Sequence, residues 1–192
     1  MFNGNGYWTS LKITSVAITV ALLTSVPSCF SPATGYRLVT QKNGIAHFSF
    51  ECPAQYSSFN LNSELQYLTY SSSRRYSGVP IASIIDVTIS EPGFFARDVQ
   101  SLVQHRIDVE RGQIDFEILE LNDLYLGEVQ ARQLVYSYAT PSGDILARGI
   151  IHLVVFNVNN LLWEIRMVSD SSMEASDTFD YLHLLETFKI LD

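Results

Sequence analysis

From Tyr36 onward the sequence consists of short runs in which apolar and polar side chains alternate, separated by residues that favour turns. Such alternation puts the apolar side chains of an extended chain on one face and is typical of half-buried strands. The runs Tyr36–Gln41 and Ile45–Glu51 flank Lys42-Asn43-Gly44, and Asn-Gly is a strong hairpin signal. The pattern therefore predicts an antiparallel sheet that begins with a hairpin.

The same alternation predicts further strands along the chain. They cover residues 61–69, 84–89, 114–118, 134–138, 146–156 and 163–167. The segment Leu146–Phe156 is almost continuously apolar, which indicates a strand covered on both faces in the middle of the sheet. The polar stretch Ser71–Gly78 is interpreted as a loop between two strands.

The spacing of the apolar residues changes to that of a helix in two places. Between Phe95 and Ile107 they follow one helix face, with Ser90 and Pro92 as start signals and Gly112 at the end. Near the C-terminus, Ser171-Ser172-Met173-Glu174 has the pattern of a capping box. The predicted buried face of this second helix consists of Ala175, Phe179, Leu182 and Leu185, widened by Tyr181 and Phe188. We expect one α+β domain over residues 36–192, with helices packed on an antiparallel sheet.

The N-terminal residues 1–28 have the pattern of an export signal. Lys12 is their only charged residue, and the apolar run Ile13–Val26 that follows it has about 14 residues, fewer than the roughly 20 that span a bilayer. The run ends in Val26-Pro27-Ser28-Cys29, which resembles the bacterial lipobox except for Pro27. In that motif the Cys is lipid-modified and becomes N-terminal. We therefore predict a lipoprotein-type signal peptide over 1–28, a lipid anchor on Cys29 and a tether over 29–35.

This prediction places the domain at the cell membrane, lipid-anchored on the extracytoplasmic side. A plain secreted protein that is cleaved nearby and an uncleaved short anchor are the alternatives. If Cys29 carries lipid, Cys52 stands alone as a small buried residue at a strand end. A Cys29–Cys52 disulfide is the competing possibility in an oxidising compartment.

The charge balance argues against two classes of partner. The chain has 12 basic and 20 acidic residues, a net charge of −8. A nucleic-acid-binding protein needs a basic surface to displace the counterions of the phosphates. Electrostatic adhesion to an anionic membrane surface also requires basic residues. We therefore expect no nucleic acid partner, and membrane attachment through the lipid on Cys29 rather than through charge.

No catalytic or cofactor motif is present in the sequence. The histidines His47, His105, His152 and His183 are far apart and lack metal-ligand spacing. There is no G-x-S-x-G nucleophile motif and no glycine-rich phosphate loop. These observations predict a protein that is not an enzyme and has no cofactor and no metal site.

Two acidic groups and one basic cluster are the remaining candidates. The acidic groups are Asp115, Glu117 and Glu120 on a strand, and Asp177 with Asp180 on the last helix. They could hold Ca²⁺ or Mn²⁺ weakly, but we interpret them as solvated faces. Arg74-Arg75-Tyr76 is a basic, aromatic cluster at a predicted loop tip. It could contact a carboxylate or phosphate of a ligand or partner, and an exposed solubility turn is the alternative.

The order of the elements resembles the PsbP-like family, which includes small bacterial lipoproteins. The similarity lies in the opening hairpin 36–53, the long hairpin 134–156, and the ending 160–168 followed by 179–190, with Thr187 where Ser is usual. It implies an α/β/α sandwich, with a central antiparallel sheet flanked by helices, and an assembly, scaffold or binding role without shared catalytic residues. Fold alone does not determine function.

The predicted function is therefore a membrane-anchored extracytoplasmic lipoprotein that binds or helps to assemble a protein partner at the outer face of the membrane. The alternative is a small-molecule or metal-binding module, either a solute-binding protein or an unrecognised enzyme.

Overall fold

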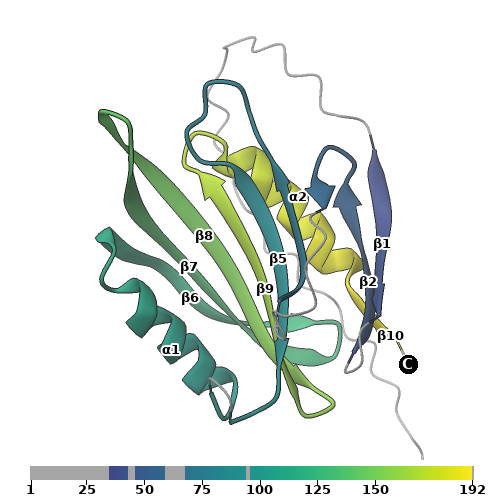
Figure 1. Ribbon diagram of the computed structural model, residues 1–192. Helices are drawn as coiled ribbons and strands as arrows, with labels where there is room; N and C mark the ends of the chain where they lie inside the picture. The colour runs from purple at the N-terminus through teal and green to yellow at the C-terminus, as the bar shows by residue number, and fades with distance from the viewer. Residues whose placement is uncertain (1–34, 43–45, 59–67, 94–95, 192) are drawn as a thin grey trace, which may run out of the picture. The chain divides into compact units, whose positions relative to one another are not determined.

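The computed structural model describes residues 35–42, 46–58, 68–93 and 96–191 (Figure 1). They belong to one compact unit, Ala33–Asp192. Within these ranges, neither helix is long and apolar enough to cross a membrane.

The described residues form ten strands and two helices. The strands are β1 (Tyr36–Lys42), β2 (His47–Pro53), β3 (Ser57–Ser58), β4 (Leu68–Arg74), β5 (Ser83–Ser90), β6 (Ile114–Leu126), β7 (Val129–Ser142), β8 (Ile145–Val158), β9 (Leu161–Asp170) and β10 (Lys189–Leu191). Helix α1 (Val99–Glu110) lies between β5 and β6 in the sequence, and helix α2 (Glu174–Thr187) lies between β9 and β10.

The strands form two sheets, in which all the pairings are antiparallel. The large sheet has seven strands in the order β3-β4-β5-β9-β8-β7-β6, and the small sheet has three in the order β1-β2-β10. Helix α1 packs against β7 and β8, whereas α2 packs against β2 and β9 (Figure 1). The predicted β1–β2 hairpin is confirmed, and its turn lies outside the described residues.

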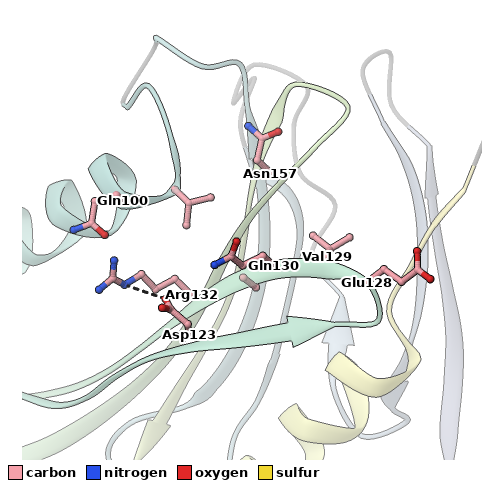
Figure 2. Close-up of a pocket in the computed structure, with 9 residues that line it drawn as sticks. Gln100, Asp123, Glu128, Val129, Gln130, Arg132 and Asn157 are labelled. Atoms are coloured by element: carbon pink, nitrogen blue, oxygen red, sulfur yellow. Dashed lines mark ion pairs between the residues drawn. The ribbon is translucent and has the colours of Figure 1, made fainter. Parts of the chain in front are cut away.

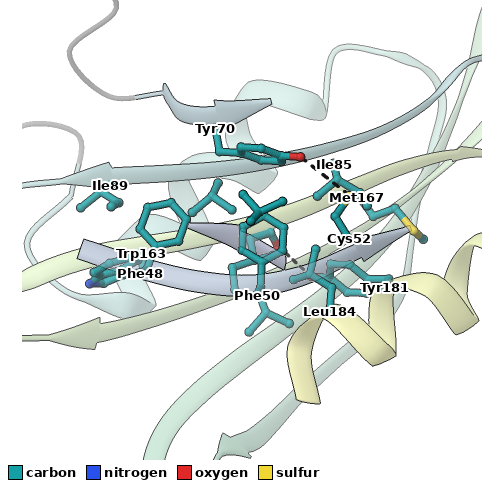
Figure 3. Close-up of a cluster of buried hydrophobic side chains, with 14 of the residues drawn as sticks. Phe48, Phe50, Cys52, Tyr70, Ile85, Ile89, Trp163, Met167, Tyr181 and Leu184 are labelled. Carbon is teal, nitrogen blue, oxygen red and sulfur yellow. Dashed lines mark hydrogen bonds between the residues drawn. The ribbon is translucent and has the colours of Figure 1, made fainter. Parts of the chain in front are cut away.

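Two hydrophobic cores lie on opposite faces of the large sheet. The core under α1 includes Leu102, Val103, Leu134, Ile151 and Leu153. The other core lies between the large sheet, the small sheet and α2, and it includes Phe48, Phe50, Trp163, Tyr181 and Leu184 (Figure 3). Strand β8 contributes to both cores because its alternate side chains point to opposite faces. All its residues from Ile150 to Phe156 are buried, which confirms the predicted central strand.

The expected fold class is confirmed in part. The central sheet is antiparallel and has a helix on each face, but the molecule is richer in sheet than an α/β/α sandwich. The difference arises because the opening hairpin does not extend the central sheet. Its apolar side chains, Phe48 and Phe50, pack onto the face that α2 also covers. The small sheet therefore covers part of the sheet face on which a layer of helices was expected.

Strand β4 corrects one sequence-based boundary. The strand predicted over residues 61–69 falls mostly outside the described residues, and β4 covers Leu68–Arg74. Ser71–Arg74, interpreted above as loop, is therefore strand. Its three serines are polar, but the antiparallel ladder with β5 satisfies their backbone groups.

Helix α1 begins later than the apolar spacing suggested. It starts at Val99, and Asp98 caps it: the Asp98 carboxylate accepts from the Ser101 backbone N–H at 2.7 Å, and the Ser101 hydroxyl accepts from the Asp98 N–H at 3.0 Å. This reciprocal pair satisfies two backbone donors that would otherwise lack partners. The helix ends at Glu110, shortly before Gly112 as predicted.

Helix α2 differs from the prediction in its cap and in its buried face. It starts at Glu174 without a side-chain cap, because Ser172 instead donates its backbone N–H and its hydroxyl to the Asp170 carboxylate. Phe179 and Leu182, predicted to be buried, are 67% and 50% exposed. The residues that α2 buries are Asp177, Asp180, Tyr181 and Leu184.

Cys52 lies near the end of β2 and is fully buried, as predicted. The Tyr70 hydroxyl donates to its Sγ at 3.7 Å (Figure 3). Burial raises the pKa of the Cys52 thiol. Cys29 lies outside the described residues, so lipid attachment and a Cys29–Cys52 disulfide both stay predictions.

Candidate functional site

A buried ionic cluster connects the large sheet to α2, and Asp177 is its centre. The Asp177 carboxylate has no exposed surface and accepts from Arg74 Nη2 at 2.5 Å, from the Tyr76 hydroxyl at 2.8 Å and from the Ser169 hydroxyl at 2.6 Å. The Ser83 hydroxyl also donates to it. The donors come from β4, β5, β9 and the segment after β4, so one helical carboxylate holds four parts of the chain together.

Arg74 is enclosed by this cluster. Its Nη2 also lies 3.2 Å from Asp180 Oδ2, and its guanidinium carbon lies 4.4 Å from the centroid of the Tyr76 ring and 4.8 Å from that of Tyr56. Burial raises the pKa of Asp180, while the charge of Arg74 acts in the opposite direction. One cation therefore lies between two buried carboxylates, and the negative charge of Asp177 also raises the pKa of Asp180.

The cluster corrects two expectations from the sequence. Asp177 and Asp180 do not form a solvated face, because the buried charge of Arg74 requires a counter-charge beside it. Arg74 ends a strand and is buried rather than at an exposed loop tip, and Tyr76 turns toward Asp177. Of the three predicted contact residues only Arg75 is exposed. A role for Arg74, Arg75 or Tyr76 in binding a partner stays a prediction.

His152 and His183 each contact side chains of other helices or strands. His152 lies in β8 with its Nε2 3.4 Å from the Thr178 hydroxyl of α2, and burial lowers its pKa. His183 lies 2.8 Å from Glu51 and stacks on Tyr36 with ring centroids 3.8 Å apart. In the part of the chain that the structure describes, no group of three or more His, Cys, Asp or Glu side chains is placed to hold a metal ion.

A second buried ion pair fixes α1 on its side of the sheet. Arg106 binds Glu164 of β9 with two parallel hydrogen bonds, from Nε at 2.6 Å and from Nη2 at 2.8 Å. Glu164 is almost fully buried, and its hydrogen bond raises the pKa of Arg106. Both oxygens of Glu164 are thus occupied by Arg106. In the Arg74 cluster the Asp177 oxygens are occupied, whereas Arg74 Nε and Asp180 Oδ2 are buried without a hydrogen-bond partner among the described residues.

An open cleft of about 610 Å³ lies between the start of α1 and the β6–β7 hairpin (Figure 2). Its polar lining includes Gln100, Asp123, Arg132 and Asn157. Arg132 Nε lies 3.7 Å from the Asp123 carboxylate, and Glu128 points away from that pair. A small-molecule site usually has polar groups that converge on one point. Here they do not, and the sequence reasoning did not single out any of these residues.

Strand β6 is an exposed edge of the large sheet, and among the strands that the structure describes it pairs with β7 alone. Gly127, with φ of 63°, makes the tight turn between them. Several large apolar side chains of this strand are exposed. They are Ile114, Ile118, Leu119, Leu121 and Tyr125.

The register with β7 sorts the side chains of β6 onto two faces. Ile118, Leu121 and Tyr125 lie opposite Tyr136, Leu134 and Gln130, so they share the face that carries α1. Glu117 and Glu120 lie opposite Ser137 and Val135, on the other face. The ladder has two irregularities, between Ile114 and Glu117 and between Ile118 and Glu120, and the second places Glu117 and Glu120 on one face despite their spacing of three.

Comparisons with known proteins bear on this fold. No family model and no curated protein matches the sequence. Among solved structures, LpqN, involved in cell envelope biogenesis of Mycobacterium tuberculosis, is similar with a TM-score of 0.58 and 13% identity, over 82% of this chain and 92% of that one. Cyanobacterial PsbP from Synechocystis has a TM-score of 0.55 and 12% identity, over 88% and 99% of the two chains.

The Ran-binding protein Mog1p of Saccharomyces cerevisiae is also similar, with a TM-score of 0.55 and 11% identity, over 82% of this chain and 96% of that one. At such identities the likeness establishes the fold and leaves the function open. The resemblance to the PsbP-like family predicted from the sequence is thus confirmed at the level of structure: this chain has the fold that PsbP shares with Mog1p and LpqN.

Proposed function

We propose that this chain is a lipid-anchored extracytoplasmic accessory protein that binds a protein partner and catalyses no reaction. The observation that carries the proposal is the exposed apolar edge of the large sheet, where Ile118, Leu121 and Tyr125 share one face. Exposed apolar side chains that gather in one place are typical of protein interaction sites. The lipobox-like sequence that ends at Cys29 supports the anchored location.

Two further observations favour binding over catalysis. The buried carboxylates Asp177 and Glu164 are occupied by arginines of the same chain, so they are not poised to act on a substrate. The proteins of similar fold include one described as Ran-binding and one involved in cell envelope biogenesis. Both descriptions suit an accessory role, and neither names a reaction.

The alternative is a small-molecule or metal-binding module, and the cleft beside Asp123 and Arg132 is the observation that favours it. Two of its polar groups, Asp123 and Arg132, pair with each other. If this alternative holds, a screen of small ligands raises the melting temperature of the wild type, and an Arg132→Ala variant loses that response.

The proposal is tested by affinity purification of the tagged full-length protein from native membranes in mild detergent, with Cys29→Ala as the matched variant. The expected result is a lipid mass on the wild type that Cys29→Ala lacks, and a stoichiometric protein partner. Intact mass measured without reductant separates lipid from a Cys29–Cys52 disulfide, which instead removes two hydrogens. A wild type that carries no lipid refutes the anchor, and one that is purified alone refutes the accessory role.

A further inference from the structure

Strand β6 presents a long backbone edge to solvent. It has 13 residues and ends the large sheet on one side, whereas β3, at the other end, has only two. Among the described residues no strand pairs with the outer side of β6. Half the backbone N–H and C=O groups of an edge strand point outward and can pair with an added strand.

The part of β6 that offers a regular template runs from Glu120 to Leu126, where the register with β7 is uninterrupted. The two irregularities lie before Glu120. A bulge bends a strand and breaks the regular row of backbone groups. The regular part is therefore the section that can accept another strand.

The side chains of β6 specify the chemistry of that strand. The apolar side chains of Leu121 and Tyr125 are 41% and 69% exposed and lie on the α1 face. Asp123 lies between them on that face, and its carboxylate is 3.7 Å from Arg132. The Glu120 carboxylate lies on the other face, and within the described ranges no cation lies within 4.0 Å of it. The side-chain amide of Asn122 donates a hydrogen bond to the Glu120 carboxylate at 3.3 Å. Glu117, on the same face, is already held by Arg148 at 2.7 Å.

We propose that β6 binds, by strand addition, an extended segment of a protein partner in which apolar side chains alternate with Lys or Arg. The apolar side chains of this segment contact Leu121 and Tyr125, and its basic side chains contact Glu120. The inference rests on the proposed partner-binding function and specifies the partner's chemistry.

The charge of β6 disfavours the other occupants. A second copy of this chain, paired antiparallel β6 to β6 through the regular part Glu120–Leu126, would place the two Asp123 carboxylates opposite each other. Like charges on facing strands destabilise the pairing. An anionic membrane surface would be repelled by the carboxylates of β6. These carboxylates would instead attract a strand in which Lys or Arg alternates with apolar residues.

The probe is a synthetic peptide of about ten residues, long enough for one strand, in which Val and Lys alternate. One control peptide has the same composition with Val and Lys in two blocks, and another alternates Val with Glu. Binding to the full-length protein in detergent is measured by calorimetry, and amide hydrogen exchange locates the site. The alternating Val–Lys peptide should bind at least about tenfold more tightly than either control and slow the exchange of residues 120–126.

Variants of β6 give the second test. Glu120→Lys and the double variant Leu121→Thr, Tyr125→Thr should each weaken the binding of the peptide at least about tenfold. Leu38→Thr, an exposed strand position of the small sheet, should leave it unchanged. Circular dichroism checks that each variant is folded, and Glu120→Gln replaces Glu120→Lys if the charge reversal unfolds the protein.

Equal binding of the three peptides, slowed exchange elsewhere than β6, or indifference to the β6 variants would each overturn the inference. Capture from native membranes separates it from the proposed function. If the wild type and Glu120→Lys capture the same stoichiometric partner equally well, strand addition fails and the partner-binding function stands. If the wild type captures none, both fail.

Discussion

Removal of the Asp177 carboxylate is the sharpest test of how α2 is held on the sheet. In an Asp177→Ala variant, Arg74 keeps Asp180 as its carboxylate partner, at 3.2 Å. The hydroxyls of Tyr76 and Ser83 lose the acceptor that Asp177 provides. The Ser169 hydroxyl keeps the Asp170 carbonyl as an acceptor, at 3.1 Å. Arg74 is 9% exposed and Asp177 is 0% exposed, so water cannot replace the lost partner without rearrangement.

The structure sets the expected magnitude. Breaking a buried ion pair by removing one partner costs about 3–5 kcal/mol. Asp180 still offsets part of the charge of Arg74, which places the loss near the lower figure, about 3 kcal/mol. For a protein of this size about 1 kcal/mol shifts the melting temperature by roughly 2–4 °C, so we expect a fall of about 6–12 °C.

The assay is unfolding by denaturant, followed by circular dichroism, with Asp108→Ala as the control. Asp108 lies in α1 and forms an exposed pair with Arg111 at 4.0 Å, so its loss should change the free energy of unfolding by less than about 1 kcal/mol. If Asp177→Ala and Asp108→Ala cost the same, the cluster does not anchor α2. In that case the explanation given for the face that α2 buries is wrong.

Three other predictions concern stability. Leu184→Ala should cost about 2–5 kcal/mol because Leu184 is fully buried, whereas Leu182→Ala, in the same helix but 50% exposed, should stay within about 0.5 kcal/mol in the same denaturant assay. Because burial lowers the pKa of His152, the unfolded state binds more protons just below the ordinary value of 6.5. Stability should therefore fall as the pH drops from about 7 to about 5, and unfolding curves of His152→Gln should show a smaller pH dependence. Arg106→Met leaves the buried Glu164 carboxylate without its partner and should lower the free energy of unfolding by about 3 kcal/mol. Arg106→Lys cannot make both hydrogen bonds, so its melting temperature should lie between those of Arg106→Met and the wild type. A melting temperature of Arg106→Met equal to that of the wild type would contradict the role given to this pair.

The strands were predictable because their signal is local. The alternation of apolar and polar residues, the Asn43-Gly44 turn signal and the apolar run of Leu146–Phe156 each depend on neighbouring residues. The length of β6 and β7 was not predicted. Residues 119–126 of β6 mix apolar and polar side chains irregularly, because an exposed edge strand has no face that must be uniformly apolar.

The orientation of α2 could not be predicted for a different reason. Asp177, Asp180, Tyr181 and Leu184 have the i, i+3, i+4, i+7 spacing of one helix face, but two of them are carboxylates, which a hydrophobic pattern assigns to solvent. The partner that reverses this assignment is Arg74, 103 residues earlier in the chain. No local sequence pattern around Arg74 or Asp177 predicts this contact, so the buried cluster could be identified only from the folded structure.

The place of β2 in the small sheet constrains the order in which the protein can fold. Strand β2 lies between β1, its neighbour in the chain, and β10, which pairs with it through Ile190 and Phe48. Strands β6 to β9 form successive hairpins, so each can close soon after it is synthesised. The small sheet instead pairs Phe48 with Ile190 across nearly the whole domain, so the entropy of closing that loop is lost before the contacts of β10 can offset it. We therefore expect Phe48 and Phe50 to stay accessible in the folding chain until β10 has paired with β2, and this apolar segment is the one that a chaperone has most reason to shield.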